Sequence, residues 1–351
     1  MKILYALPAT GNGHISRAAA IYPYLKKYGA VDFLISGSNS QLNYSFPVKY
    51  KFKGLSLYYD CSGGLSLRNI FQKNSFRNFW KDAKSLDLSH YDMVISDYEP
   101  ISALACKIKK QPFLHWGHQA SFVYEEVPRP TGKIYPGKWI LENLVYSPLS
   151  YGIHFKSFHS NISTSIIKDE IFYAPRLEEN LVTVYLQQYN LDTLLNFFKN
   201  YTKSTINIFH PEIKEISTFR NIHLFPIHKI LFDQSLIYSK LLITASGFES
   251  PSEAMHLNKR LISIPIHTHY EQSCNAIALD AMGVVVLRSL SQLSNDIIDR
   301  ELKNFGLADY NFHATSSEEA CLNIMNYWES NFNIGGSGVQ SFEPCFDQLF
   351  V

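Results

Sequence analysis

The stretch that decides the fold reads KILYALPATGNGHISR and occupies residues 2–17. Residues 2–8 form a short apolar run, a glycine-containing loop follows, and from Ile15 the apolar positions have helical spacing. A strand, a glycine turn and a helix in this order are typical of a parallel sheet with helices on both faces. Residues 2–17 therefore predict an α/β fold.

The alternation of strands and helices recurs along the 351 residues of the chain. It lapses in a proline-rich and aromatic region at about residues 128–180 and then restarts. Because domains usually hold about 100 to 200 residues, we predict two Rossmann-like doubly wound domains that face a central cleft. The expected parts are an amino-terminal domain at 1–170, a carboxy-terminal domain at 171–315, a helix at 316–332 that packs back on the first domain, and a flexible tail at 333–351.

The composition narrows the class of protein. Hydrophobic residues make up 46% of the chain and charged residues 18%, which predicts a folded protein with a large core. The 32 Lys and Arg residues balance 31 Asp and Glu residues, so no basic field for nucleic acid exists. Five cysteines without CxxC spacing fit neither a disulfide framework nor a zinc site and favour the cytoplasm. No apolar run is long enough to span a membrane, although peripheral contact at the inner face of the membrane stays open.

The first loop of interest follows the opening strand and contains Gly11, Asn12 and Gly13, with His14 next to them. It lacks the third glycine of the dinucleotide fingerprint, so a nicotinamide cofactor fits poorly. Imidazole is the side chain best able to accept a proton from a hydroxyl group at neutral pH. Asp97 ends a strand at the same edge of the sheet and could hold the tautomer of His14. The alternative is that both residues only cap helices.

A second loop runs from residue 244 into a helix and contains Ser246, Gly247, Phe248, Glu249 and Ser250. Backbone amides at the amino terminus of a helix can bind phosphate without a metal ion. One turn further on, Glu253 could accept hydrogen bonds from a ribose diol. The next helix start offers Gln272 and Asn275 to sugar hydroxyls, unless this is an ordinary polar loop. His267 and His269 lack a third ligand at a suitable spacing, so we expect no metal site.

These motifs, in this order, resemble those of the GT-B glycosyltransferases, in particular the MurG-like and UDP-glucuronosyltransferase-like families. The similarity spans residues 1 to about 330. It implies that the carboxy-terminal domain binds a nucleotide-sugar and the amino-terminal domain binds the acceptor. The resemblance assigns roles as follows: Gly247 and the amides after it to the diphosphate, Glu253 to the ribose, Gln272 to the donor sugar, Ile227 to the base through main-chain groups, His14 to the catalytic base, and Asp97 to its orientation.

The resulting hypothesis is a metal-independent, inverting enzyme that moves a sugar from a UDP-sugar to an acceptor hydroxyl. The nucleotide-sugar is a substrate, and no cofactor is expected. The acceptor is a glycan, a lipid or a small molecule, with cell-envelope glycans suggested by the resemblance to MurG. The alternatives are a UDP-sugar 2-epimerase on the same fold, a non-catalytic nucleotide-sugar or lipid-binding protein, and a dehydrogenase. The aromatic segment 134–151 is either an acceptor-facing lip or a helix that packs between the domains.

Overall fold

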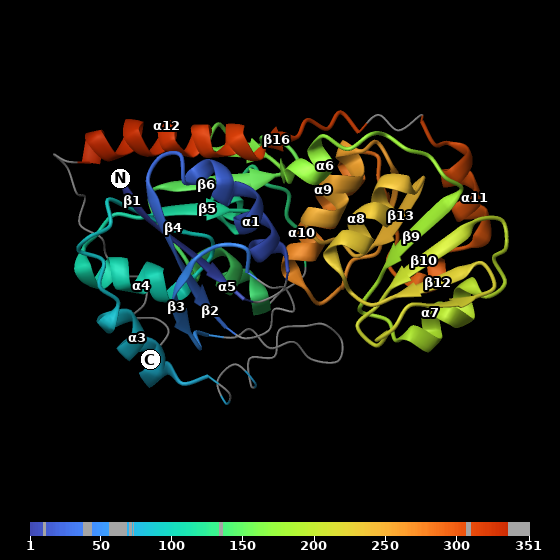
Figure 1. The fold of residues 1–351 in the computed structure, drawn as a ribbon, viewed down its shortest axis with the longest axis horizontal. Helices are drawn as coiled ribbons and strands as arrows, with labels where there is room; N and C mark the ends of the chain where they lie inside the picture. Colours follow the sequence, from blue (N-terminus) through green and yellow to red (C-terminus); the bar gives the residue numbers. More distant parts are fainter. Residues whose placement is uncertain are drawn as a thin grey trace.

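The structure is a computed structural model that describes residues 1–9, 12–37, 44–55, 69, 72, 74–132, 136–306 and 310–335. Two seven-stranded sheets dominate it, one in each half of the chain, with helices on both faces of each sheet (Figure 1). The expected two-domain, Rossmann-like α/β architecture is confirmed.

The amino-terminal sheet has the order β3-β2-β1-β4-β5-β6-β7, and all of its neighbouring strands are parallel. Its strands are β1 (Lys2–Pro8), β2 (Ala30–Ser36), β3 (Val48–Phe52), β4 (Met93–Ser96), β5 (Leu114–Gly117), β6 (Ser150–His154) and β7 (Ile162–Thr164). The helices of this half are α1 (Gly13–Leu25), α3 (Phe76–Ser85), α4 (Pro100–Lys109), the 3-10 helix η1 (Gln119–Val123) and α5 (Pro136–Asn143). Pro100 begins α4, where its missing amide hydrogen has no intrahelical partner to lose.

The carboxy-terminal sheet has the order β11-β12-β10-β9-β13-β14-β15, and only the edge strand β11 is antiparallel. Its strands are β9 (Leu181–Tyr185), β10 (Thr205–Phe209), β11 (Ser217–Phe219), β12 (Ile222–Phe225), β13 (Leu241–Thr244), β14 (Arg260–Ser263) and β15 (Val285–Val286). The helices are α6 (Asp169–Phe172), α7 (Leu191–Phe198), α8 (Lys229–Tyr238), α9 (Glu249–His256), α10 (Tyr270–Ala281), the 3-10 helix η2 (Leu290–Gln292) and α11 (Asn295–Lys303). Helix α9 begins at Glu249, so Glu249 and Ser250 of the second loop belong to its first turn.

The last helix returns to the first domain. A short parallel pair of β8 (Ile166–Ile167) and β16 (Thr315–Ser316) leads into α12 (Ser317–Gly335), which lies along the amino-terminal half beside α1 (Figure 1). The Cys321 thiol donates to the carbonyl of Ile21 in α1 at 3.6 Å. Helix α12 extends three residues past the predicted end at 332, because no glycine interrupts it before Gly335. The predicted tail from residue 336 onward lies outside the described residues.

Buried apolar side chains from both halves of the chain pack together in one cluster. One buried cluster includes Ile15 and Trp116 from the amino-terminal domain together with Phe248 and Ala254 from the carboxy-terminal domain. This packing brings the loop after β1, which leads into α1, against the loop after β13, which leads into α9. Because ligands of open α/β sheets bind beyond the carboxyl ends of the strands, both ligand-binding edges meet at the boundary between the domains.

Candidate active site

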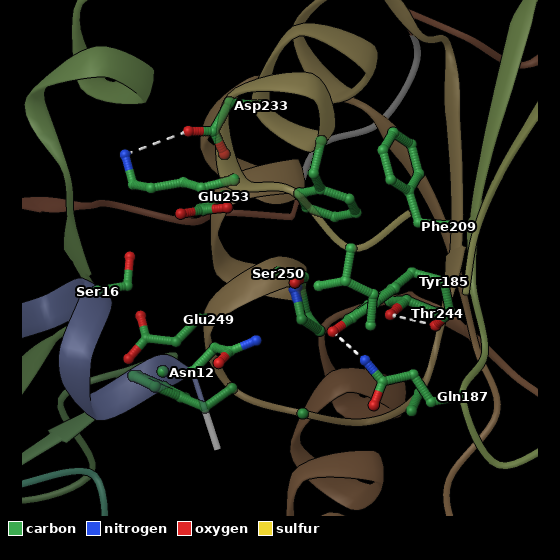
Figure 2. A pocket seen from close by; sticks show the side chains of 18 of the residues that line it. Asn12, Ser16, Tyr185, Gln187, Phe209, Asp233, Thr244, Glu249, Ser250 and Glu253 are labelled. Atoms are coloured by element: carbon green, nitrogen blue, oxygen red, sulfur yellow. Dashed lines mark hydrogen bonds and ion pairs between the residues drawn. The ribbon is translucent and has the colours of Figure 1, made fainter. Parts of the chain in front are cut away.

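A cavity of about 440 Å³ lies at this boundary. Figure 2 shows Asn12, Ser16 and Glu249 on one side of it and Tyr185, Thr244 and Phe209 on the other. The sequence-predicted residues that line the cavity are Asn12, Gly13, Ile227, Gly247, Phe248, Glu249, Ser250, Glu253 and Gln272. Gly11 lies outside the described residues.

His14 and Asp97 meet beside the cavity, as the sequence pattern suggested. His14 lies in the first turn of α1, and Asp97 follows β4 directly. Nδ1 of His14 is 3.1 Å from Oδ1 of Asp97, whose side chain is fully buried. Burial by itself would raise the pKa of Asp97, but the charges of Arg17 and His14 hold that pKa at about 2. The carboxylate is therefore ionised at neutral pH and can accept the Nδ1–H of the imidazole. The NH2 group of Arg17 lies 3.2 Å from the same ring nitrogen.

Arg17 fixes this carboxylate and was not singled out from the sequence. It lies one turn after His14 in α1, and its side chain is 4% exposed. Its NH2 group donates to both oxygens of Asp97, at 2.7 and 2.8 Å. Tyr5 donates to Oδ2 of Asp97 at 3.3 Å. The i, i+3 spacing of His14 and Arg17 on one helix is a signal that could have revealed this residue.

Gly117 leaves the space that Asp97 occupies. A Cβ atom added at Gly117 would lie 2.4 Å from Oδ1 of Asp97. The carboxylate of Asp97 thus excludes a side chain at Gly117, the last residue of β5, whose φ of +159° is also one that L side chains rarely adopt.

The amino terminus of α9 faces the cavity. Phe248 is its N-cap and provides no side-chain hydrogen bond to the first turn, so its first amides have no side-chain acceptor from the cap and no partner within the helix. A Cβ atom at Gly247 would meet nothing within 4 Å, which shows open space at this point. The arrangement can bind an anion.

Glu249 connects this helix end to the pair formed by His14 and Asp97. Its Oε1 accepts from NH1 of Arg17 at 2.5 Å, across the boundary between the domains. Burial raises the pKa of Glu249 to about 7, against the lowering effect of Arg17. Arg17 thus contacts one carboxylate from each domain.

Glu253 lines the cavity but already has a partner. Its Oε1 lies 2.8 Å from Nζ of Lys168, which also donates to Asp233 at 2.6 Å. Burial raises the pKa of Glu253, and the charge of Lys168 opposes that effect. Lys168 and Asp233 also line the cavity, and the sequence analysis did not identify them.

Ser246 and Asn275 lie outside the cavity lining and bind other protein groups. The hydroxyls of Ser246 and Ser263 are 2.7 Å apart. Asn275 donates to the carbonyl of Ser246 at 3.2 Å, and its Oδ1 lies 3.0 Å from Nε2 of His118. Both side chains fix the loop before α9, and Asn275 also joins it to His118 of the amino-terminal domain.

The contact around His118 also joins the domains. Its ring stacks on Phe248 with centroids 4.0 Å apart and an angle of 9° between the planes. Gln119 donates to Glu271 at 3.1 Å. The neighbouring Gln272 lines the cavity, and its Oε1 accepts from the amide of Ile266 at 3.0 Å. Nothing in the sequence around His118 and Gln119 indicated these contacts.

Asp32 is the first acidic residue after the glycine loop, and in a dinucleotide-binding chain such a residue would end the second strand. Asp32 lies near the start of β2, where its carboxylate binds Lys49 at 2.7 Å and Tyr91 at 2.6 Å, away from the carboxyl edge that a dinucleotide would occupy. Within the described ranges, no group of three or more His, Cys, Asp or Glu side chains is placed to hold a metal ion. Over those same residues, no helix combines the length and apolar character needed to cross a membrane.

Residues 140–306 match the family model described as Glycosyl transferase family 1. A search of curated protein sequences finds no match. Among solved structures, Acinetobacter baumannii MurG is similar with a TM-score of 0.54 and 13% identity, over 93% of this chain and 100% of that chain.

Two further structures share the fold. The Streptomyces sp. SF2575 glycosyltransferase SsfS6, complexed with thymidine diphosphate, has a TM-score of 0.57 and 10% identity, over 93% of this chain and 99% of that chain. A putative UDP-N-acetylglucosamine 2-epimerase from Listeria monocytogenes has a TM-score of 0.53 and 12% identity, over 95% of this chain and 98% of that chain. The match to Glycosyl transferase family 1 over residues 140–306 and the shared two-domain GT-B fold together support a glycosyltransferase enzyme.

Proposed function

We propose that the protein transfers a sugar from a nucleotide-sugar, a UDP-sugar in the first instance, to an acceptor hydroxyl with inversion at the anomeric carbon. The observation that carries this proposal is the pair of His14 and Asp97, 3.1 Å apart, beside a cavity that the amino terminus of α9 also faces. A base and an anion-binding helix end thus lie on opposite sides of the boundary between the domains.

The chemistry follows from this placement. Asp97 holds Nδ1 of His14, and Nε2 accepts the proton of the acceptor hydroxyl as its oxygen attacks the anomeric carbon. The imidazolium that forms is stabilised by the ionised Asp97. The departing nucleoside diphosphate gains negative charge, which the amides at Gly247 to Ser250 stabilise without reorganisation. A single displacement of this kind inverts the configuration of the sugar.

The donor contacts are proposed residue by residue. Gly247 and the first amides of α9 bind the diphosphate, Glu253 the ribose, Gln272 the sugar, and the backbone at Ile227 the base. Their common place in the lining of one cavity supports this assignment. The thymidine diphosphate in SsfS6 supports a nucleoside diphosphate as the ligand class.

The direct test is a His14→Ala variant. We expect it to bind UDP with the wild-type affinity, measured by calorimetry, and to lose at least about 100-fold in transfer, since general bases contribute 10²–10⁴-fold. A panel of UDP-, GDP- and TDP-sugars, scored by release of the nucleoside diphosphate with the wild-type protein, identifies the donor for this assay. A variant that keeps most of its turnover would remove His14 from the role of base.

A second candidate function is epimerisation of a UDP-sugar, which the similarity to the putative 2-epimerase of Listeria monocytogenes favours. Incubation with a UDP-sugar alone distinguishes the two reactions. An epimer formed without acceptor would establish the second function, whereas consumption that depends on an added acceptor supports transfer.

The acceptor is proposed only as a class: the hydroxyl of a glycan, a lipid or a small molecule, reached at the cytoplasmic side. Helix α5, in the aromatic segment considered as an acceptor lip, packs against α10 of the other domain, and Tyr270 of α10 donates to Glu142 at 3.2 Å. This contact supports the alternative of an inter-domain packing helix for residues 136–143. Binding of the protein to vesicles that contain anionic lipid tests peripheral membrane contact.

A further inference from the structure

Glu249 places a carboxyl group where the donor diphosphate is proposed to bind. It occupies the first position of α9, lines the cavity, and its side chain is 25% exposed. Figure 2 shows it next to Asn12. A Cβ atom at Gly13 would lie 3.2 Å from Cγ of Glu249, so α1 packs closely on this side chain and limits its movement away from the cavity. An ionised carboxylate here would repel a diphosphate, because like charges that face each other cost binding free energy.

The other side of Glu249 contacts Arg17. NH1 of Arg17 donates to Oε1 of Glu249 at 2.5 Å, while NH2 donates to both oxygens of Asp97. Asp97 alone therefore compensates the buried charge of Arg17. Glu249 can become neutral without leaving an unpaired buried cation, which would be strongly destabilising.

The charged groups around Glu249 come from three elements. Helix α1 contributes His14 and Arg17, the segment after β4 contributes Asp97, and α9 itself contributes Glu253. Lys168, from the segment before α6, is engaged by Glu253 and Asp233. Burial raises the pKa of Glu249 to about 7, Arg17 opposes this shift, and Glu253 adds to it. Proton uptake near neutral pH therefore requires little free energy.

We propose that Glu249 binds the donor diphosphate in its protonated form, so that donor binding above neutral pH takes up a proton from solvent at this carboxyl group. A carboxylate can only accept hydrogen bonds, whereas the protonated group donates its O–H to a phosphate oxygen. The inference rests on the proposed nucleoside diphosphate site and adds the protonation state in which Glu249 binds the ligand.

The test compares the wild-type protein with Glu249→Gln, which is permanently neutral and keeps a donor in the same place. UDP binding is measured by calorimetry at pH 6 and pH 8, each in two buffers of different ionisation enthalpy. At pH 8 we expect Glu249→Gln to bind UDP about tenfold more tightly than the wild type, the order of effect of one like-charge contact. The variant should also take up fewer protons. The terminal phosphate of UDP titrates in both proteins, so the difference between them is the readout.

Two further variants control the result. Glu249→Asp keeps an ionisable group and is expected to show no gain at pH 8. Glu318→Gln removes an exposed charge that binds Lys27 at 2.7 Å, and because neither residue lines the cavity this variant is expected to match the wild type. Equal or weaker UDP binding by Glu249→Gln, or an equal gain in Glu249→Asp, overturns the inference while the nucleotide site stands. If neither protein binds UDP or TDP at any pH, the proposed function falls together with the inference.

Discussion

The substitution Gly117→Ala is expected to displace the orienting carboxylate of Asp97, and it also places an L residue at a φ of +159°. The added Cβ atom would lie 2.4 Å from Oδ1 of Asp97, whereas real Cβ atoms essentially never come within 3.0 Å of such a neighbour. The carboxylate must therefore move by at least about 0.6 Å. Arg17 holds both of its oxygens at 2.7 and 2.8 Å and Tyr5 holds one at 3.3 Å, so that movement lengthens these bonds and shifts the partner of His14.

The expected effect falls mainly on the rate. A misplacement of about 1 Å at a reacting group costs about 100-fold in rate, so we expect kcat/KM for sugar transfer to fall by about 30- to 100-fold. The free energy of unfolding should fall by about 1–3 kcal/mol, as for other insertions of a methyl group into a packed interior. UDP affinity should remain within about threefold of wild type, because Gly117 does not line the cavity.

The assay measures transfer with a donor that the wild type consumes, UDP binding by calorimetry, and stability by urea unfolding. Gly283→Ala controls for backbone strain, because Gly283 also has a positive φ, +83°, and its added Cβ would meet nothing within 4 Å. Gly137→Ala in α5 controls for an added methyl group at an ordinary contact, 3.8 Å from the Cβ of Tyr270. A folded Gly117→Ala variant with more than a third of the wild-type kcat/KM would refute the role of the position of Asp97.

Other substitutions test the remaining contacts. Glu253→Ala should weaken UDP binding by about 10- to 100-fold, the value of hydrogen bonds to a charged group; unchanged affinity by calorimetry would remove Glu253 from the ribose site. Asp97→Asn should abolish most transfer and lower stability in a pH-dependent manner. The folded pKa of Asp97, about 2, lies below its unfolded value, so its charge stabilises the fold by about 2 kcal/mol above pH 4 and this contribution is lost as the pH falls towards 2. Urea unfolding of the wild type and of Asp97→Asn should show a smaller difference in the free energy of unfolding at pH 3 than at pH 6. An equal difference at the two pH values would contradict the ionised state assigned to Asp97.

The sequence was sufficient for the architecture because local patterns specify it. The run of residues 2–17 became β1, its loop and α1, and the loop from residue 244 became the turn between β13 and α9. In parallel sheets the chain direction alone puts such loops at one edge. The pairing of His14 with Asp97, 83 residues further along the chain, could therefore be predicted from the sequence. The distance of 3.1 Å between Nδ1 and Oδ1 confirms that the two side chains lie together.

The contacts between the domains could not be read in the same way. Asn275 was assigned to sugar hydroxyls from its place at a helix start, but its amide instead joins Ser246 and His118. Which face of α10 meets the other domain depends on how the two sheets are placed relative to each other, and no local pattern specifies that. The same holds for Lys168, whose two acidic partners come from α8 and α9.

Arg17 contacts both halves of the proposed site, and this has a consequence for domain opening. Separation of the domains breaks its 2.5 Å contact with Glu249 and the stack of His118 on Phe248, but leaves its two bonds to Asp97 intact. The base and its carboxylate thus stay assembled in the amino-terminal domain when the nucleotide leaves. Glu249 alone loses its cation and enters water, where an ordinary carboxyl group ionises at neutral pH. Product release would then return to solvent the proton that was taken up on donor binding, so the charge of the Glu249 side chain changes as the cleft opens and closes.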